Sequence, residues 1–539
     1  MDKMAGNDRK ALYQALWNSA DILRSKMDAS EYKNYLLGLV FYKYLSDRLL
    51  HYVVNVLEEE ETDLKSAQKI YEQAFSDIQV RDDLIEELNN EFSYIIEPSL
   101  TFTAFIEEIH NGTFQLESLA QGFRNIEQSS ELFENLFEDV DLYSRRLGST
   151  PQKQNQHISA VIKELADLDL SHQGDILGDA YEYLIGQFAE SSGKKAGEFY
   201  TPQAVSTLMT RIVIEGKVDQ RGFSIYDPTM GSGSLMLNAK KYSNFPGTIE
   251  YFGQELNTST FNLARMNMIL HSVDIGNQHL KNGDTLDADW PTDEPTNFDA
   301  VLMNPPYSAK WGAEKGFLDD PRFSPYGVLA PKSKADFAFL LHGYYHLKEN
   351  GVMAIVLPHG VLFRGAAEGK IRKILLENSA IDCIIGLPSN IFFNTSIPTT
   401  VIILKKNKEK RDVLFIDASQ EFIKQKNQNM LAPEHIEKIL DTYRKRETID
   451  KYSYLAEFEE IVENDFNLNI PRYVDTFEEE EPISLTEVSK ELFEINQSIA
   501  DAEKELFSMF QELVGTTDEA QADLDGLLKY FQKAGDNDE

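Results

Sequence analysis

The sequence predicts an α/β protein in which a Rossmann-like, doubly wound sheet lies between an all-α N-terminal domain and a C-terminal heptad helix. Before Gly148 and Pro151, glycine and proline are sparse and apolar residues recur at helical spacing. From about residue 166, short apolar runs alternate with helical patterns, which is typical of a largely parallel sheet. After about residue 425 the chain is again helical and acidic. The expected domains are therefore residues 1–165, 166–425 and 426–539.

The charge balance limits how this chain can act on nucleic acid. Its 539 residues include 52 basic and 89 acidic ones, for a formal net charge of −37. Because Lys and Arg bind backbone phosphates, so acidic a chain needs a basic partner or a local basic patch to hold DNA. The single cysteine, Cys383, excludes an intramolecular disulfide and a cysteine-rich zinc site. The polar N-terminus and the absence of a long apolar stretch predict a cytoplasmic protein without a membrane span.

The first domain is predicted from a helical apolar pattern. Its clearest members are Tyr35, Leu36, Leu39, Val40, Tyr44 and Leu45. Residues 148–156 combine glycine, proline and polar side chains, which predicts a linker or a long loop.

The strands of the central sheet are predicted from short apolar runs. These lie at residues 224–226, 249–253, 298–303, 352–357, 381–386 and 400–404, and a further short strand follows at 413–416. Helical patterns separate most of them. Doubly wound sheets bind ligands at the carboxyl ends of their strands, so the residues that follow these runs are the candidates for function.

The C-terminal region is expected to contain a long helix at about residues 485–514. Ser484 and Glu487 fit a capping box at its start. Apolar residues then follow at alternating steps of three and four: Leu485, Val488, Leu492, Ile495, Ile499, Ala502, Leu506, Met509 and Leu513. This heptad seam predicts either pairing with another chain, such as a partner subunit, or packing against the N-terminal helices of the same chain.

A glycine-rich turn follows the first predicted strand. Asp227 directly follows that strand, and Gly231 and Gly233 let the backbone approach a ligand closely before a helix begins. Asp227, Gly231 and Gly233 are therefore candidate cofactor contacts. The turn lacks the Gly-Lys-Ser/Thr ending of a P-loop, so a triphosphate is not the expected ligand.

Two acidic residues at the next strand ends suit an adenosine cofactor. Glu255 could accept hydrogen bonds from both ribose hydroxyls, and Asp284 could receive the adenine amino group. An NAD-type turn is the alternative, but the third glycine of that motif is missing. S-adenosylmethionine is therefore the expected cofactor.

The segment before the first strand is a further candidate for cofactor binding. Thr201 is predicted to be a helix N-cap with Pro202 at the first helical position, followed by Gln203. The N–H groups of that helix start could meet a carboxylate of the cofactor. Glu198 opens the segment, and Phe199 and Tyr200 could flank the methionine part. An ordinary capped helix is the alternative.

The turn after strand 298–303 points to chemistry on a planar amine. Asn304 offers a side-chain carbonyl, and Pro305 offers a backbone carbonyl without a competing N–H. Together they could accept both hydrogens of an exocyclic amine, while Tyr307, after Pro306, could stack on its ring. Phe392 and Phe393 are candidates to stack on the other face of that ring, or else they belong to the core.

Together these motifs resemble the modification subunit of type I restriction–modification systems (HsdM-type), a site-specific N6-adenine DNA methyltransferase. Residues 16–24 and 27–33 resemble the helical N-terminal domain of that family. The catalytic core is matched in the expected order by residues 199–202, 227–233, 253–255 and 304–307, and residues 465–473 resemble the stretch before its C-terminal helix. The resemblance covers nearly the whole chain. Met230 and Ser232 are a modest departure within the glycine turn.

The resemblance implies a class I S-adenosylmethionine-dependent methyltransferase core with cofactor contacts at residues 198–203, at Ser232, Gly233 and Ser234, and at Glu255. It implies methylation of an adenine flipped out of double-stranded DNA, without a metal. It also implies a separate specificity subunit, usually bound by two copies of this chain, and a restriction subunit that can join them. No basic recognition helix or zinc module stands out in the sequence, so the DNA target cannot be read from this chain.

Two rival functions stay open at this stage. A protein glutamine N5-methyltransferase can use the same Asn-Pro-Pro-Tyr turn, although the long helical domain and the heptad tail argue against it. A non-catalytic assembly subunit is the other, and the intact motifs oppose it.

His342 and His346 are more typical of a helix surface or core than of a metal site. The basic run at residues 405–411 predicts an exposed loop or a DNA contact.

Overall fold

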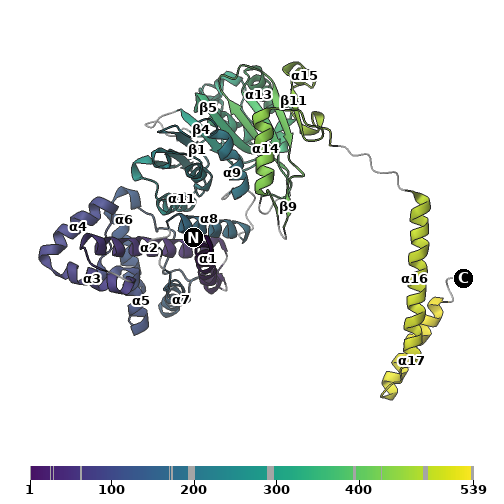
Figure 1. Ribbon diagram of the computed structural model, residues 1–539, viewed down its shortest axis with the longest axis horizontal. Coiled ribbons are helices and arrows are strands. Elements are labelled where there is room, and N and C mark those ends of the chain that lie inside the picture. The colour runs from purple at the N-terminus through teal and green to yellow at the C-terminus, as the bar shows by residue number, and fades with distance from the viewer. Residues whose placement is uncertain are drawn as a thin grey trace. The chain divides into compact units, whose positions relative to one another are not determined.

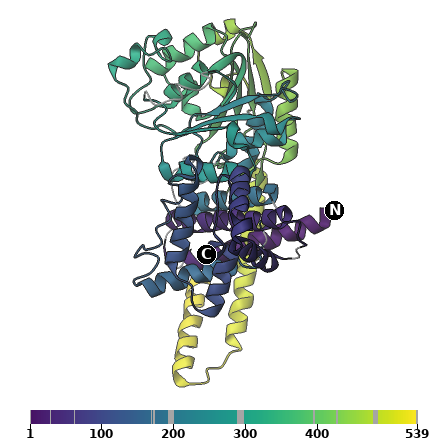
Figure 2. The ribbon, with the colours of Figure 1, turned by 90° about the vertical axis from the view of Figure 1, so that its left-hand side faces the viewer.

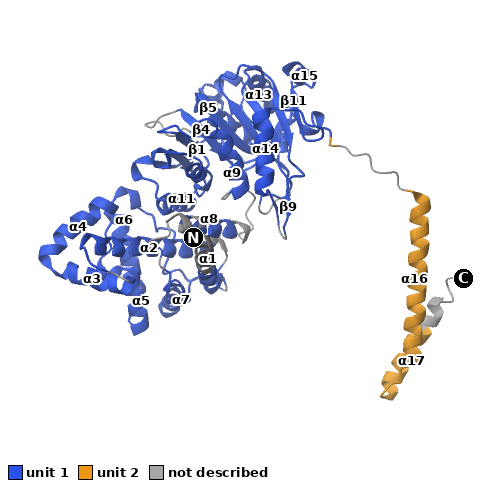
Figure 3. Cartoon of the chain, in the orientation of Figure 1, with its two compact units in different colours: residues 1–475 blue, residues 476–539 orange. Residues whose placement is uncertain are grey.

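The computed structural model describes residues 2–24, 26–27, 29–60, 63–168, 170, 174–191, 201–287, 297–392, 396–425, 428–476 and 484–535. The chain forms two compact units, residues 1–475 and 476–539 (Figure 3). The first unit joins a helical domain to a sheet covered by helices, and the second is made of two helices (Figure 1).

Four helices of the N-terminal domain begin at polar residues that cap them with a side chain. Asp63, Asp77, Thr101 and Thr150 each accept a hydrogen bond from a backbone N–H of the helix that follows. Its α-helices are α1 Asp2–Arg24, α2 Ala29–Val56, α3 Leu64–Ser76, α4 Ile78–Phe92, α5 Phe102–Asn111, α6 Leu116–Ser129, α7 Pro151–Glu164 and α8 Gly174–Ser191. The side chains of α2 are buried on nearly all sides, so this helix is the centre of the domain.

The expected linker at residues 148–156 is instead the start of a helix. Thr150 caps α7 and Pro151 occupies its first turn, a position that tolerates the missing N–H of proline. The side chain of Gln154 donates to the carbonyls of Tyr143, Ser144 and Gly148 at 2.9, 3.0 and 3.0 Å. These bonds tie the preceding loop to the helix, which a composition-based prediction of a linker does not anticipate.

The helical domain packs on the sheet domain through α11 Thr258–Leu270. One face of this helix, with Leu263, Met266, Ile269 and Leu270, belongs to the core of the helical domain. The guanidinium of Arg265 donates to the carbonyl of Glu134 at 2.9 Å, and the side chain of Asn262 donates to that of Asn135 at 3.0 Å. The two parts of the first unit therefore share a continuous interface.

The central sheet has nine strands in the order β11-β8-β6-β7-β5-β4-β1-β2-β3. Strand β7 runs antiparallel to both of its neighbours and β11 runs antiparallel to β8, while the other pairs are parallel. The strands are β1 Ser224–Asp227, β2 Glu250–Glu255, β3 Gln278–Asn282, β4 Phe298–Met303, β5 Leu347–Pro358, β6 Ile381–Gly386, β7 Thr399–Lys405, β8 Val413–Asp417 and β11 Ser453–Ala456. A separate hairpin pairs β9 Ile423–Lys424 with β10 Asn429–Met430. This is the expected doubly wound architecture.

Helices cover both faces of the sheet. One face packs against α9 Gln203–Val213, α10 Ser234–Leu237 and α14 Pro433–Lys445. The other face packs against α12 Asp336–Tyr345, α13 Ala366–Glu377 and α15 Phe458–Glu463. Successive residues of a strand alternate between the two cores, as Ala300 and Val301 do in β4. Short 3-10 segments connect the elements at Pro98–Leu100, Glu131–Phe133, Asn238–Lys241, Pro246–Thr248, Ile275–Asn277, Lys315–Leu318, Ser324–Tyr326, His359–Leu362 and Ile470–Arg472.

The sheet domain extends beyond the boundary expected at residue 425. Helix α14 covers the sheet, and β11 lengthens it by pairing with β8. A side chain at Gly386, at the end of β6, would meet the Ile470 side chain at 2.7 Å, so residues near 470 lie against the sheet. The compact unit therefore ends at Asp475, and only the residues after it form a separate unit.

The second unit is a helical hairpin of α16 Leu485–Gln511 and α17 Asp518–Gly535, which lie side by side in Figures 1 and 2. The Ser484 hydroxyl accepts a hydrogen bond from the N–H of Glu487 at 3.3 Å, as the capping pattern predicts. Helix α17 lies in the region predicted to be helical, although only the heptad helix was given bounds from the sequence. No helix in the part of the chain that the structure describes is both long and apolar enough to cross a membrane.

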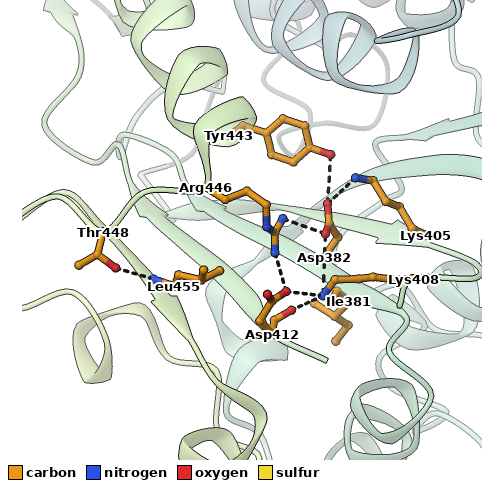
Figure 4. Close-up of polar contacts among 9 residues, drawn as sticks. All are labelled: Ile381, Asp382, Lys405, Lys408, Asp412, Tyr443, Arg446, Thr448 and Leu455. Carbon is orange, nitrogen blue, oxygen red and sulfur yellow. Dashed lines mark hydrogen bonds and ion pairs between the residues drawn. The ribbon is translucent and has the colours of Figure 1, made fainter. Parts of the chain in front are cut away.

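Two lysines of the basic run at residues 405–411, Lys405 and Lys408, form ion pairs within the sheet domain, whereas Lys410 and Arg411 are exposed (Figure 4). Lys405 and Lys408 lie with Arg446 around the buried Asp382, at N–O distances of 2.8, 3.9 and 2.9 Å. Burial alone would raise the pKa of the Asp382 carboxyl, but Lys405, Arg446 and Lys408 together hold it below its ordinary value. Because β7 is antiparallel, this run lies at the amino ends of the parallel strands, away from the edge where ligands are expected.

Candidate active site and cofactor site

The predicted site residues meet at the carboxyl edge of the sheet. Strands β1, β2 and β4 are neighbours, and they end at Asp227, Glu255 and Met303, which Asn304 follows. Strand β3 lies beyond β2 and ends two residues before Asp284. The order of the sheet therefore brings together four chain segments that are far apart in the sequence.

The glycine turn has the backbone conformation that its glycines allow. Gly231 and Gly233 have φ angles of 53° and 79°, in the left-handed region that other residues avoid. A side chain on Gly233 would also meet the Cε of Met268 at 3.1 Å. Asn267 donates from Nδ2 to the carbonyl of Ser232 at 3.0 Å, and the hydroxyls of Ser232 and Ser234 are 3.0 Å apart. The turn is thus held from α11 in one conformation.

Met230 is accommodated by a glycine in the neighbouring strand. A side chain at Gly253 would lie 2.3 Å from the Sδ of Met230, which is buried. The large residue in the glycine turn therefore packs over Gly253, and its departure from the family pattern leaves the backbone of the turn intact.

Glu255 is joined directly to the glycine turn. Its Oε2 accepts from the N–H of Gly231 at 3.1 Å, and its Oε1 accepts from the N–H of Asn257 at 2.8 Å. Burial raises the pKa of this carboxyl, while these backbone hydrogen bonds act in the opposite direction. A carboxylate in this position has further lone pairs with which to accept hydroxyl protons of a ligand beside the turn.

Asp227 is a buried carboxyl at the end of β1. Its Oδ1 accepts from the backbone N–H and the hydroxyl of Thr229 at 2.9 and 3.3 Å. Burial raises its pKa to about 8, and the hydrogen bonds from Thr229 only partly oppose that rise. In the cofactor-free protein Asp227 is therefore mainly protonated at neutral pH.

We expect Asp227→Asn to flatten the pH dependence of stability in the cofactor-free protein. Because the folded pKa is about 8, above the ordinary value of 3.8, the native state holds an extra proton between these pH values. The associated stability is complete below the unfolded pKa and is lost as pH rises through the folded pKa, by an amount on the order of a few kcal/mol. Urea unfolding at pH 5, 7 and 9 measures this, with exposed Asp284→Asn as the matched control. Parallel pH profiles for Asp227→Asn and the parent would contradict the expectation.

Asp284 stands on an exposed loop after β3. Its Oδ1 accepts from the N–H of Leu286 at 3.0 Å. The side chain of Asn282 donates to the carbonyl of Glu255 at 2.7 Å, which ties this loop to the end of β2. Asp284 is therefore placed beside the Glu255 strand end, where an adenine amino group could reach it.

The prediction that Thr201 caps a helix is wrong. Helix α9 begins at Gln203 with Pro202 as its N-cap, and the Thr201 hydroxyl instead accepts from Nδ2 of Asn304 at 3.1 Å. Gln203 donates from Nε2 to Oδ1 of Asn238 at 2.7 Å. Glu198, Phe199 and Tyr200 lie outside the described residues. The segment that the sequence linked to the cofactor thus also orients the proposed catalytic amide.

The carboxamide of Asn304 is buried and held from two sides. Its Nδ2 donates to Thr201, and its Oδ1 accepts from the hydroxyl of Tyr307 at 3.0 Å. Burial raises the pKa of the Tyr307 hydroxyl, so Tyr307 stays a neutral donor. These two bonds hold the plane of the amide in one orientation, and its oxygen keeps a second lone pair for another donor.

The turn is anchored by an ion-paired carboxylate. The N–H of Ser308 donates to Oδ1 of Asp336 at 2.7 Å, and Arg364 pairs with Oδ2 of Asp336 at 2.8 Å. Ser308 has a φ of 52°, so the chain turns sharply just after Tyr307. Asp336 and Arg364 therefore position the Asn304–Tyr307 turn.

Phe392 belongs to the core. It is 1% exposed and meets Tyr307 edge-on, with ring centroids 6.1 Å apart and an angle of 85° between the rings. This arrangement supports the Tyr307 ring and leaves no face of Phe392 exposed to stack on a base. Phe393, the other candidate for stacking, lies outside the described residues.

His342 on α12 and His346, the C-cap residue of that helix, are structural. Nε2 of His342 lies 2.9 Å from the hydroxyl of Tyr226, and its Nδ1 lies 3.1 Å from Nη1 of Arg322. Burial lowers the pKa of His342, so it is neutral, and His346 is buried beside it. In the described ranges, no group of three His, Cys, Asp or Glu side chains could hold a metal ion.

Three neighbours of the site were not predicted from the sequence: Asn267, Asp336 and Arg364. Their contacts span separations along the chain that no local motif records. A polar residue within an apolar helical pattern, as Asn267 is among Met266, Met268 and Ile269, is the one local signal of such a role.

Comparisons with known proteins agree with this site. The family model of N-6 DNA methylases matches residues 172–482, and the model of the HsdM N-terminal domain matches residues 12–165. The chain is 34% identical to the type I restriction enzyme MpnII methylase subunit of Mycoplasma pneumoniae, over 95% of this chain and 97% of that protein. It is also 34% identical to the type I restriction enzyme HindI methylase subunit of Haemophilus influenzae, over 57% of this chain and 70% of that protein.

A solved structure shows the same fold in a closer relative. The methyltransferase subunit of the type I restriction–modification system from Streptococcus thermophilus has a TM-score of 0.86 and 70% sequence identity, over 87% of this chain and 100% of that chain. The methylase model alone spans more than half of the sequence. This chain therefore belongs to the N-6 DNA methylase family, among the methylase subunits of type I restriction–modification systems.

Proposed function

We propose that this chain is a modification subunit that transfers a methyl group from S-adenosylmethionine to N6 of adenine, in a DNA sequence chosen by a separate specificity subunit. The observation that carries the proposal is the meeting of two features at one sheet edge. The buried amide of Asn304 can hold an amine, and the glycine turn joined to Glu255 can receive an adenosine. The glycine turn follows β1. Glu255 and Asn304 lie at the ends of β2 and β4, the two strands that flank β1.

The residues at the sheet edge fit the proposed cofactor. Gly231 and Gly233 keep side chains away from the turn, Glu255 would accept from the ribose hydroxyls, and Asp284 would accept from the adenine amino group. Asp227, Ser232, Ser234 and residues 201–203 complete the proposed contacts. When bound, the cofactor supplies an activated methyl group.

The chemistry of the chain itself is to hold and orient the amine. An adenine in a duplex must leave the base stack before its N6 can be reached. The open lone pair of Asn304 Oδ1 and the carbonyl of Pro305 would accept its two amino hydrogens, and the Tyr307 ring would stack on the base. Hydrogen bonds from the amine to these oxygens place electron density on nitrogen and direct it at the methyl carbon. Pro306 keeps the turn rigid.

The test is methyl transfer from labelled S-adenosylmethionine to unmethylated DNA, with and without the cognate specificity subunit, followed by nucleoside analysis. N6-methyladenine that appears only with the partner is the expected result. Methylation without the partner would show that this chain reads DNA itself. Labelled glutamine in a protein, or no transfer despite cofactor binding, would favour the protein glutamine N5-methyltransferase or the assembly subunit.

The second unit is the proposed docking element for the specificity subunit. The apolar side chains of its heptad seam are exposed, with Leu492 at 59%, Ile495 at 58% and Ile499 at 51%. An exposed seam of this length on a helix is typical of one that pairs with a helix of another chain. Two copies of this chain on one specificity subunit, with a restriction subunit able to join, complete the proposed assembly.

We expect Leu492→Asp with Ile499→Asp to abolish binding of the specificity subunit, because two charges would have to be buried in the seam. Gln497→Asp with Ser508→Asp on α16 is the matched control outside the seam. Partner affinity is measured by analytical ultracentrifugation, and cofactor binding should be equal in both variants. Parental affinity in the seam variant would rule out this docking mode.

A further inference from the structure

A cavity of about 410 Å³ lies between α13 and residues 464–472 of the chain. Its lining carries four cationic side chains against the single carboxylate of Asp465: Lys370, Arg372, Lys373 and Arg472. We call this cavity, with its four cations, the basic groove. Its local excess of positive charge contrasts with the whole chain, which has 52 basic and 89 acidic residues. Three of its cations, Lys370, Lys373 and Arg472, are exposed.

The floor of the basic groove is a buried arginine bound to neutral groups. Arg372 donates to the carbonyls of Phe466, Val361 and Arg364 at 2.7, 3.0 and 2.9 Å. Burial lowers its pKa to about 10, and Glu368 acts in the opposite direction. An anion in the groove would offset that cost of burying the guanidinium.

Helix α13 contributes the polarity of its backbone to the same groove. Gly365, Ala366 and Gly369 line it at the first turn, and the N-cap Gly365 makes no side-chain capping hydrogen bond. Small residues and an N-terminus without a side-chain cap let an anion reach the backbone N–H groups of the first turn. Glu368, in that turn, is buried and pairs with Arg364 at 3.0 Å.

The basic groove lies at the same edge of the sheet as the Asn304–Tyr307 turn. Strand β5 is parallel to β4, so the 3-10 segment His359–Leu362 and the start of α13 emerge at the edge that carries Asn304. Arg364 pairs with Asp336, which holds the N–H of Ser308, and the carbonyl of Arg364 accepts from Arg372. A continuous set of contacts therefore joins the groove floor to the residue that follows Tyr307.

We propose that the basic groove binds backbone phosphates of the DNA duplex whose adenine enters the site. The inference rests on the proposed function, because it takes DNA as the substrate. Phosphate is the anion that suits exposed lysines, an arginine and a helix start in one groove. Contacts of this kind position the duplex without reading its sequence, which leaves sequence recognition to the partner.

The experiment compares the parental complex with a Lys370→Gln, Lys373→Gln, Arg472→Gln variant, each assembled with the specificity subunit. DNA affinity is measured over a series of salt concentrations. Removal of one phosphate-binding cation should reduce the slope of log K against log salt by about 0.9, so the slope should fall by about 2.7 if all three bind phosphates. Lys370→Gln alone should reduce it by about 0.9. Cofactor affinity should not change.

The matched control removes the same charge at the opposite edge of the sheet. Arg221→Gln, Lys410→Gln, Arg411→Gln also replaces three exposed cations, at the amino ends of the strands, and should leave the slope at its parental value. An equal decrease of the salt slope in both variants would mean that the change in net charge, rather than the position of the cations, causes it. That result would overturn the groove proposal.

The outcomes separate the groove from the proposed function. A groove variant with the parental slope, in a complex that methylates DNA, would overturn the groove proposal and leave the function standing. A parental complex that neither binds nor methylates DNA would overturn both. A groove variant that fails to assemble would mark the groove as a binding surface for an acidic protein, and so would also overturn the proposal.

Discussion

Asn304→Ala is expected to reduce methyl transfer by about 10²–10³-fold while cofactor binding and assembly stay at parental values. The substitution removes the oxygen that would accept an amino hydrogen of the target base, and one preorganised hydrogen-bond partner is worth about that much in a transition state. The buried amide contacts only Thr201 and Tyr307 among the bonds of its side chain that the structure records, so its loss leaves the glycine turn and Glu255 unchanged.

Single-turnover methylation by the complex with the specificity subunit measures this loss, because it isolates the methyl-transfer step from product release. Asn277→Ala is the matched control, since that side chain donates to the carbonyl of Gly247 at the opposite edge of the sheet. Tyr307→Phe keeps the ring but removes the hydroxyl that orients Asn304, and should cost about tenfold. Normal methylation by the Asn304→Ala variant would favour the interpretation that this chain is a non-catalytic assembly subunit.

The strand ends were predictable because their chemistry is local in the sequence. Each candidate, such as Asp227 or Glu255, directly follows an apolar run, and parallel strands bring their carboxyl ends to one edge. The order of the strands across the sheet was not predictable, because apolar periodicity along the sequence does not show which strands are neighbours. Strand β7 carries a partial signal: no helical pattern separates it from β6, and a parallel connection would need a crossover.

The errors have a common physical origin in long-range contacts. Thr201 has the sequence signature of a helix cap, yet its hydroxyl is taken by Asn304, a residue far along the chain. Residues 426–475 read as a helical tail, yet β11 pairs with β8 and α14 covers the sheet. Lys405 and Lys408 belong to a run that was predicted to be an exposed loop or a DNA contact, yet both form ion pairs with Asp382 at the edge of the sheet. In each case a partner remote in sequence overrides the local preference.

Asp382→Ala is expected to destabilise the first unit by about 3–5 kcal/mol, because it leaves three cations near one buried position without their shared carboxylate. Asp382 also accepts from the hydroxyl of Tyr443 at 3.1 Å, and Arg446 continues the network to Asp412 at 2.8 Å (Figure 4). Strands β6 and β7, the β7–β8 loop and the end of α14 are thus joined through one side chain.

Thermal unfolding and hydrogen exchange of the amides in β6, β7 and β8 measure the effect. Glu377→Ala is the matched control: its exposed pair with Lys373, at 3.8 Å, should contribute less than about 1 kcal/mol. Because the folded pKa of Asp382 is lowered, the stability it provides is present above the ordinary pKa and is lost as pH falls through the folded value. The difference between parent and Asp382→Ala should therefore shrink in acid. A difference that persists there would mean that packing, rather than the ion pairs, accounts for the loss.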